Sequence, residues 1–451
     1  MEVLAPISSI ASFSRITDGC SELGSEHLPL YNYAMHLHTI LILVLATAFA
    51  PTLARADTLL AQYFRLLDAG VSRVEAKLKV MPNADLATLE SQPGWRPFPH
   101  AVLPPAVLYT SQHPDNPRYH DPRMLQLALR IGDLLAGEEK SGGFTPRLDS
   151  HRDTYMWLEA YRLLEGELGP ERKERWKRGI QANIAELVEG TRQRQDRAWY
   201  AAPFIGTSSN HYSLWASTLY LGGRVLGVKE WEEMGREILH RFVLEEQAPD
   251  GYWGEHSTAG PTIGYNYLTL SGIALYGEIS KDPDVLAALR RATNFHKNST
   301  FLDGTPIDVF NDRNRYWSVS PWGHFAFSHF PDGRGYAAFL TSFFDPQTIS
   351  MEALGRIAQN AIYYHEGPSE APPQQQASYA YRMSVPAGVR KTGPWQVALS
   401  GMIDTQARTN QFFLDRQGHV SIFHQKAGLI ISGANSKRQP DLETFTEGVD
   451  G

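Results

Sequence analysis

Much of the chain has apolar positions at the three- and four-residue intervals of amphipathic helices. The segment 58–79 is the first to show this spacing. Further helices are expected at about 123–137, 151–167, 171–192, 210–227, 229–247, 263–280, 283–298 and 351–365. Turn residues such as Gly169-Pro170 and Asp282-Pro283 separate several of them. The stretch 93–122 is rich in Pro and too broken for long helices.

The pattern changes after Pro372-Pro373 to short runs with the clustering or period-two alternation of strands. These runs lie at 378–385, 395–402, 409–415, 419–423 and 428–433, with turns at Gly393-Pro394 and 416–418. We therefore predict an α+β multidomain protein. Helical hairpins over 57–365 form an (α/α) toroid, and an antiparallel β-sheet domain over 374–451 follows and is truncated. An α-solenoid is the competing arrangement, but the chain has no strict repeat period.

The first 56 residues differ from the rest. Residues 1–34 follow neither period and are expected to be an unstructured or non-native leader. A segment that starts at Met35 has a short apolar run and ends in Ala54-Arg55-Ala56, an A-x-A-type cleavage signature. We expect 35–56 to be a signal peptide, Asp57 to be the mature N-terminus, and the protein to be secreted or periplasmic. An uncleaved anchor is the alternative, because the segment before the apolar run has no Lys or Arg.

Composition excludes several classes of protein. A hydrophobic share of 42% in 451 residues argues against global disorder, and a formal net charge of −7 argues against a general nucleic-acid binder. An anionic ligand stays possible, because a cleft can be locally basic. The chain has one cysteine, Cys20, which lies in the leader, so the mature chain has no disulfide framework, CxxC zinc site or thiol nucleophile.

Two short motifs offer proton-transfer chemistry. Asn210-His211 opens one apolar helical segment, and Gly264-Tyr265-Asn266-Tyr267 opens another about fifty residues later. An amide can stabilise the charge that builds on a carboxylate, an imidazole can take a proton, and a phenol can protonate a leaving oxygen. Together they suit β-elimination next to a uronate carboxylate. The structural alternatives are that Asn210 caps its helix and that both tyrosines are core residues.

Other residues near these motifs are candidates for substrate contacts. A turn with aromatic and ionisable residues precedes Gly264, and a polar, aromatic segment that begins at Asn311 does not look helical. Its arginines, which include Arg334 near its end, can bind carboxylates bidentately or form structural salt bridges. The substrate-binding candidates are Tyr267, Trp253, Glu255, His256, Arg313, Arg315, Tyr316, His324 and Arg334. His324 and His329 lack metal-ligand spacing, so the sequence favours a structural role for each and predicts no metal or other cofactor.

The order and separation of these motifs resemble those of the heparinase II/III-like and alginate-lyase-like polysaccharide lyases, over roughly residues 120–451. The resemblance implies a toroid followed by antiparallel β-sheets, with Asn210 neutralising the carboxylate. It also implies His211 as base or carboxylate partner and Tyr265 as acid or base. Family members sometimes take a further Tyr or His, or a structural metal, from the β domain, where His419 and His424 are the candidates here. The tyrosine motif departs from the family by lacking a basic residue beside it.

The sequence therefore predicts a lyase for an acidic polysaccharide or oligosaccharide, without a nucleic-acid partner and without a membrane span after signal removal. One alternative is a glycoside hydrolase on the same kind of ring. It needs paired carboxylates, for which Asp250 with Glu255 or Asp149 are the candidates. The other alternative is a non-catalytic protein that binds glycans through aromatic side chains.

Overall fold

The structure is a computed structural model that describes residues 58–137, 153–195, 209–254, 261–310, 318–401 and 419–433. All of them belong to one compact unit, Asp57–Gly451. The expected leader and signal peptide lie outside the described residues. Among the described helices, none is both long and apolar enough to cross a lipid bilayer.

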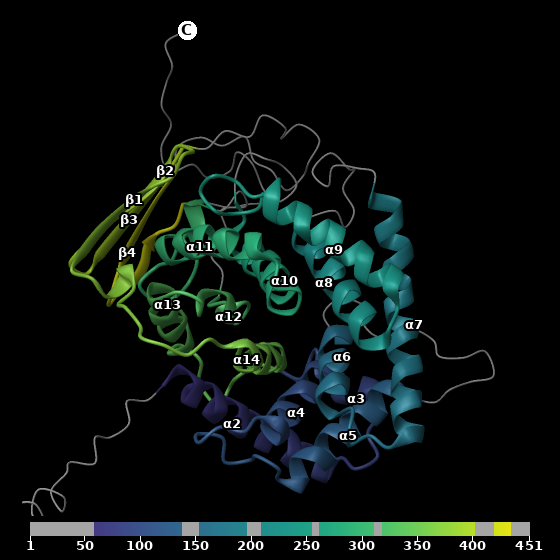
Figure 1. The fold of residues 1–451 in the computed structure, drawn as a ribbon. Coiled ribbons are helices and arrows are strands. Elements are labelled where there is room, and N and C mark those ends of the chain that lie inside the picture. Colours follow the sequence, from purple (N-terminus) through teal and green to yellow (C-terminus); the bar gives the residue numbers. More distant parts are fainter. Residues whose placement is uncertain are drawn as a thin grey trace, which may run out of the picture. The chain divides into compact units, whose positions relative to one another are not determined.

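The helices form two layers. Successive members of the inner layer contact one another, and the last contacts the first, so the layer closes on itself. The inner helices are α4 (Leu103–Thr110), α6 (Asp153–Leu164), α8 (Ser209–Leu226), α10 (Ile263–Ser280), α12 (His324–Phe327) and α14 (Met351–Tyr363). The closing contact is between α14 and α4. Figure 1 shows these helices around a common centre.

Each outer helix packs on an inner one. The outer helices are α2 (Leu59–Val80), α5 (Pro122–Ala136), α7 (Pro170–Gln195), α9 (Lys229–Leu244), α11 (Pro283–Asn298) and α13 (Pro331–Thr341). In this order they contact α14, α4, α6, α8, α10 and α12. Short elements complete the helical part: α3 (Leu86–Glu90), η1 (Phe98–Val102), η2 (Asp308–Phe310) and η3 (Pro373–Gln375). The predicted (α/α) toroid is therefore confirmed.

Local signals explain where several helices begin. The Thr58 side chain accepts a hydrogen bond from the Ala61 backbone N–H and caps α2. Asp282 caps α11 in the same way, with Pro283 at the first helical position. The long helices begin and end within a few residues of the predicted bounds.

Among the described α-helices, four were not predicted: the short α3 and α12, and the longer α4 and α13. In the Pro-rich stretch, α4 forms because its prolines lie in the first turn, where the missing N–H groups have no helical partner in any case. The segment that contains Arg334 was expected to be non-helical, which is wrong. Pro331 starts α13 there. Gly333 and Gly335 lie so close to neighbouring backbone that a Cβ at either position would collide with it, so glycine is needed at both.

The described residues of the C-terminal part form a five-stranded antiparallel sheet with its strands in chain order, and an antiparallel sheet was predicted there. The strands are β1 (Ser378–Arg382), β2 (Ala387–Thr392), β3 (Trp395–Ser400), β4 (His419–His424) and β5 (Gly428–Ile431). The prediction missed β2, which is short of apolar residues and buries Lys391 on its inner face. The predicted turn at Gly393-Pro394 joins β2 to β3, and Gly393 has a positive φ of 56°. The predicted strand at 409–415 lies outside the described residues.

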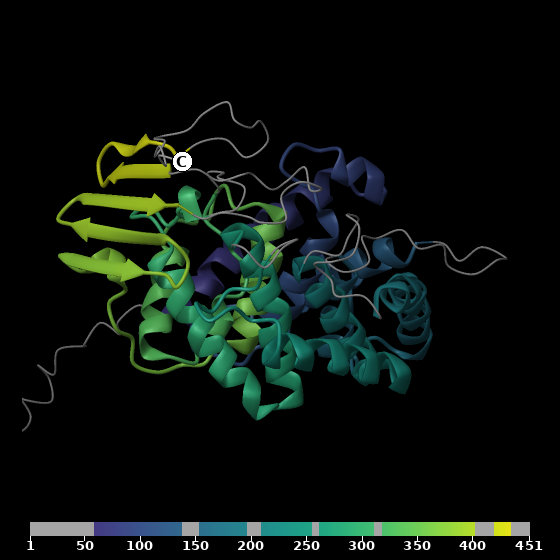
Figure 2. The ribbon, with the colours of Figure 1, turned by 90° about the horizontal axis from the view of Figure 1, so that it is seen from above.

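The sheet is bonded to the helical part through buried contacts, and Figure 2 shows its strands beside the helices. Asp308, in η2, accepts hydrogen bonds from Ser421 Oγ at 2.5 Å, Ser432 Oγ at 2.9 Å and the Gly433 backbone N–H at 3.0 Å. Phe423 of β4 stacks on Phe301 with ring centroids 5.0 Å apart. The carboxylate of Asp308 is fully buried, and the Val309 backbone N–H also donates to it at 3.0 Å, so these donors replace the water that it loses on folding.

Candidate functional site

Two adjacent inner helices, α8 and α10, carry the predicted catalytic residues. Ser209 Oγ lies 3.3 Å from Thr269 Oγ1, and both residues are buried. Further along both helices, a Cβ added to Gly272 would lie 2.9 Å from the carbonyl oxygen of Ser213. Ser209 thus pairs with Thr269, and Ser213 pairs with Gly272. Because residue numbers increase together along both helices, α8 and α10 run parallel.

This parallel packing brings the three predicted catalytic residues to one end of the helix pair. Asn210 and His211 lie in the first turn of α8, and Tyr265 lies in the first turn of α10. The Thr269 hydroxyl, which contacts Ser209, also donates to the Tyr265 carbonyl at 3.5 Å. Tyr265 is therefore about one helical turn, roughly 6 Å, beyond the level of Ser209.

The three side chains differ in exposure. Asn210 is buried, with only 1% of its surface exposed, and its backbone carbonyl accepts a hydrogen bond from Ser213 Oγ at 3.1 Å. His211 and Tyr265 are partly exposed. The imidazole of His211 lies beside Trp215, with ring centroids 6.2 Å apart. The site thus combines a buried amide with an imidazole and a phenol that reach the surface.

Tyr267 has a structural role in place of the predicted substrate contact. Its side chain is fully buried, and its hydroxyl lies 2.5 Å from that of Tyr336, which in turn lies 2.7 Å from Thr300 Oγ1. Its ring packs on His296 at 4.1 Å. Burial raises the pKa of Tyr267 to about 12 despite these hydrogen bonds. Tyr267 is therefore a core residue, which was the alternative interpretation.

Three more predicted substrate-binding residues are also interior. Trp253 is fully buried, and its Nε1–H donates to the Phe242 carbonyl at 2.9 Å. Burial lowers the pKa of His324 to about 4, and its Nε2 donates to a backbone carbonyl at 2.8 Å. Arg334 is 7% exposed and donates to two backbone carbonyls, those of Ser328 and Pro368. Each side chain is held by internal partners, so the prediction of substrate contact is corrected for all three.

The remaining predicted substrate-binding residues lie outside the described residues: Glu255, His256, Arg313, Arg315 and Tyr316. The same holds for Asp149, a candidate of the hydrolase alternative. Among the candidates of that alternative, Asp250 lies in the described part of the chain. It accepts hydrogen bonds from the backbone N–H and the hydroxyl of Ser384 and so joins the turn after α9 to the turn between β1 and β2.

The two histidines predicted from the β domain have structural surroundings. His419 is buried on the inner face of β4, and only 2% of it is exposed. His424 Nδ1 accepts from the backbone N–H groups of Lys426 and Ala427 in the turn to β5.

Sequence reasoning missed a charged network inside the helical layers. Glu159 of α6 is fully buried and accepts hydrogen bonds from Tyr155 at 3.0 Å, Arg162 at 2.6 Å and Tyr363 of α14. These bonds tie two inner helices together. Tyr363 is about two hundred residues from Glu159, so no local pattern signals the contact.

A second group was also missed, and it has the chemistry of a metal site. Glu278, His329 and His365 place three ligand atoms within 4.8 Å of one another near the C-terminal end of α10. Burial tends to raise the pKa of Glu278, but hydrogen bonds from the two imidazoles outweigh it and lower this pKa to about 2. Glu278 is therefore a carboxylate at neutral pH. The separation of these residues in the chain gives no motif.

Comparison with known proteins gives a likeness in fold. No protein-family model matches the chain, and no curated protein does either. Among solved structures, it is similar to the chondroitin AC lyase of Streptomyces coelicolor A3 in complex with chondroitin sulphate, with a TM-score of 0.48 and 14% identity. That match covers 81% of this chain and 54% of the other. A mutant of the same lyase matches with a TM-score of 0.46 and 13% identity, over 80% and 54% of the two chains. The chain thus spans about half the length of the structures that it matches.

Proposed function

We propose that the protein is a polysaccharide lyase that cleaves a uronic-acid-containing glycan by β-elimination at the N-terminal ends of α8 and α10. The observation that carries this proposal is the parallel packing of the two helices, with Ser209 Oγ 3.3 Å from Thr269 Oγ1. It gathers an amide, an imidazole and a phenol at one end of the pair. This set can remove the C5 proton of a uronate and protonate the departing C4 oxygen.

The helix ends favour an anionic group. The first backbone N–H groups of a helix have no partner within it, and the helix dipole adds a partial positive charge at the same end. Two parallel helices add these effects on one side, where a uronate carboxylate would lie. Asn210 is the residue proposed to hydrogen-bond that carboxylate. Because Asn210 is buried, its amide is fixed and weakly screened, which strengthens stabilisation of the charge formed in the transition state.

The proposed reaction needs one base and one acid. His211 takes the proton from C5, the electrons of the C–H bond form the C4–C5 double bond, and the bond between C4 and the glycosidic oxygen breaks. Tyr265 donates its phenolic proton to that oxygen. Both side chains are partly exposed, so a polymer can reach them. The products are an unsaturated uronate and a new saturated chain end.

Variants of the proton-transfer residues test the proposal. His211→Ala and Tyr265→Phe should each lower kcat by about 10²–10⁴-fold, the usual contribution of general acid–base catalysis. Asn210→Ala should lower it by on the order of 10²-fold, as the loss of an oxyanion-hole donor does. Tyr267→Phe is the matched control, because it removes a hydroxyl from the same helix but from a buried position. It should lower stability and leave kcat unchanged. Near-wild-type turnover in both the His211 and Tyr265 variants would exclude this site.

Arg313 and Arg315 are proposed to bind the anionic polymer. They lie outside the described residues, so this proposal rests on the sequence, in which an acidic chain needs local cations to attract a polyanion. Replacing either with Ala should mainly raise KM, and the effect should shrink at high salt because salt screens exposed charges. Arg334→Ala is the control. Because Arg334 is buried, its loss should lower the melting temperature and should cause no salt-dependent change in KM. A wild-type KM at low salt for both Arg313 and Arg315 variants would assign these residues to the scaffold.

A further inference from the structure

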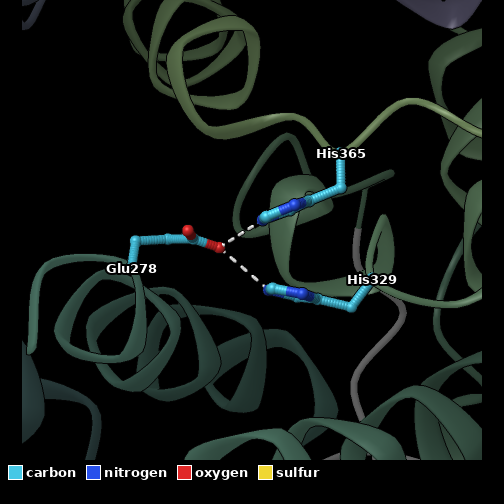
Figure 3. A group of neighbouring side chains, drawn as sticks. All are labelled: Glu278, His329 and His365. Atoms are coloured by element: carbon cyan, nitrogen blue, oxygen red, sulfur yellow. Dashed lines mark hydrogen bonds and ion pairs between the residues drawn. The ribbon is translucent and has the colours of Figure 1, made fainter. Parts of the chain in front are cut away.

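Three side chains from distant parts of the chain converge at one point (Figure 3). Glu278 lies near the C-terminal end of α10, His329 lies between α12 and α13, and His365 follows α14. The Nε2 atoms of His329 and His365 lie 2.8 Å and 2.7 Å from the same oxygen, Oε1 of Glu278. The two imidazole rings lie side by side with centroids 4.0 Å apart.

This geometry matches the ligand set of a transition metal. Two imidazole nitrogens and one carboxylate oxygen are a common three-ligand set for Zn²⁺, which is bound at about 2.0–2.2 Å from N and O atoms. At those bond lengths, tetrahedral ligand atoms lie roughly 3.3 Å apart. The observed separations of 2.7–2.8 Å need to open by only about half an ångström.

The surroundings hold both histidines in place without using their ligand atoms. The His365 backbone N–H donates to Ser328 Oγ at 3.0 Å, which ties the two histidine segments together. Arg334 spans the same segments, donating to the Ser328 carbonyl at 2.6 Å and to the Pro368 carbonyl at 2.7 Å. These bonds fix the backbone of the two segments, so both histidines belong to a preformed arrangement. The buried Arg334 thus gains a positioning role at this site.

The group is also accessible. The side chain of Glu278 is 7% exposed, that of His329 is 19% exposed and that of His365 is 40% exposed. The partner of the second carboxylate oxygen is Lys281, whose Nζ lies 3.5 Å from Oε2. An ion can therefore enter from the His365 side and keep a position for water.

A second group with similar chemistry provides a contrast. His240, Asp282 and Asp284 also gather, but with one imidazole only. Asp282 caps α11, and its Oδ2 already accepts a hydrogen bond from Tyr276 and contacts His240 Nδ1 at 2.8 Å. The capping of α11 therefore accounts for the arrangement of His240, Asp282 and Asp284.

We propose that Glu278, His329 and His365 form a binding site for a divalent first-row transition metal, with Zn²⁺ as the first choice. The site is separate from the proposed lyase site, because Tyr265 and Glu278 are about 20 Å apart along α10. The ion joins the end of α10, the connection between α12 and α13, and the segment that leads from α14 to the sheet. Its role is to stabilise these three segments, and it does not depend on the proposed lyase activity.

Zinc titration of the full chain, freed of metal with a chelator, tests the site. One equivalent of Zn²⁺ should bind and raise the melting temperature, whereas Mg²⁺ and Ca²⁺ should not, because they prefer oxygen ligands. Co²⁺ in the same site should show the visible bands of a tetrahedral complex. Failure of the wild-type chain to bind one equivalent of Zn²⁺ would overturn the proposal.

Three variants locate the bound ion. His365→Ala removes an exposed ligand and should weaken Zn²⁺ binding by more than about 10-fold, since loss of even an outer-shell partner costs about 10–100-fold. Glu278→Gln keeps an oxygen that accepts from both imidazoles but loses the charge, and should weaken binding similarly while the fold persists by circular dichroism. His240→Ala is the control and should bind Zn²⁺ as the wild type does. Wild-type affinity in Glu278→Gln and His365→Ala, or an equal loss in His240→Ala, would refute the assignment.

Discussion

The close approach of α8 and α10 at Gly272 gives a sharp test of how the proposed site is positioned. A Cβ at this position would lie 2.9 Å from the carbonyl oxygen of Ser213 and 3.1 Å from its carbonyl carbon. Both atoms belong to the backbone, so no side chain can turn away. Since ordinary contacts begin near 3.4 Å, Gly272→Ala should push the two helices apart by about 0.5 Å.

The expected cost follows from two opposing terms. Replacing a glycine in a helix by alanine gains about 1 kcal/mol of helix propensity. Overpacking a core typically costs about 1–3 kcal/mol. The net destabilisation is therefore about 1 kcal/mol, which lowers the melting temperature of a chain of this size by about 2 °C. Because a misplacement of 1 Å can cost about 10²-fold in rate, a shift of half that size should cost on the order of 10-fold in kcat.

The matched control is Gly222→Ala in α8. Its Cβ would lie 2.7 Å from the far end of a flexible side chain, Ile184 Cδ1, and at an ordinary contact distance of 3.8 Å from Leu158 and Trp231. This variant should be as stable as the wild type or more stable, with unchanged kcat. Thermal unfolding and lyase kinetics of both variants, measured side by side, decide the matter. If Gly272→Ala is as stable and as active as Gly222→Ala, the close contact of the two helices does not position the site.

Two further predictions concern stability and processing. Burial would raise the pKa of Asp332, but hydrogen bonds from Arg290 and Lys297 hold this pKa well below its usual range. These hydrogen bonds therefore stabilise the folded state fully above about pH 4, and this stabilisation is lost as the pH falls through the folded pKa. Asp332→Asn should therefore lower the free energy of unfolding by on the order of 1–2 kcal/mol at pH 7. Urea titrations should show that the difference from the wild type shrinks below about pH 4. An equal difference at all pH values would contradict this. We also propose that the protein is secreted or periplasmic and begins at Asp57 after processing. N-terminal sequencing of the exported protein checks this, and retention of residues 1–34 would count against it.

Periodicity predicted many of the helices because they bury one face against their neighbours. The prediction of 123–137, for example, agrees with α5, which buries Met124, Leu127, Ala128, Ile131 and Leu135 at helical spacing. The elements that were missed depend on context. In α4, prolines are tolerated only because they lie in the first turn, and the strand β2 buries a lysine. Neither feature is visible from apolar spacing alone.

The candidate site was less predictable than the fold. The motifs at Asn210-His211 and Tyr265 were visible in the sequence, but their meeting at one end depends on the parallel packing of α8 and α10. The direction in which an aromatic side chain points was not predictable either, so Tyr267 and Trp253 were assigned to the substrate although both are fully buried. The group around Glu278 was invisible because its members are brought together only by closure of the helical layers.

The central claim is that this site performs β-elimination on an acidic glycan. The most direct measurement is the ultraviolet absorbance of the C4–C5 unsaturated uronate during incubation with a panel of acidic polysaccharides. We predict that this absorbance grows with the wild-type chain on at least one polymer and is abolished by His211→Ala and by Tyr265→Phe. Release of saturated reducing ends alone would indicate a hydrolase, and binding without any product would indicate a glycan-binding protein. Either result would contradict the proposed function.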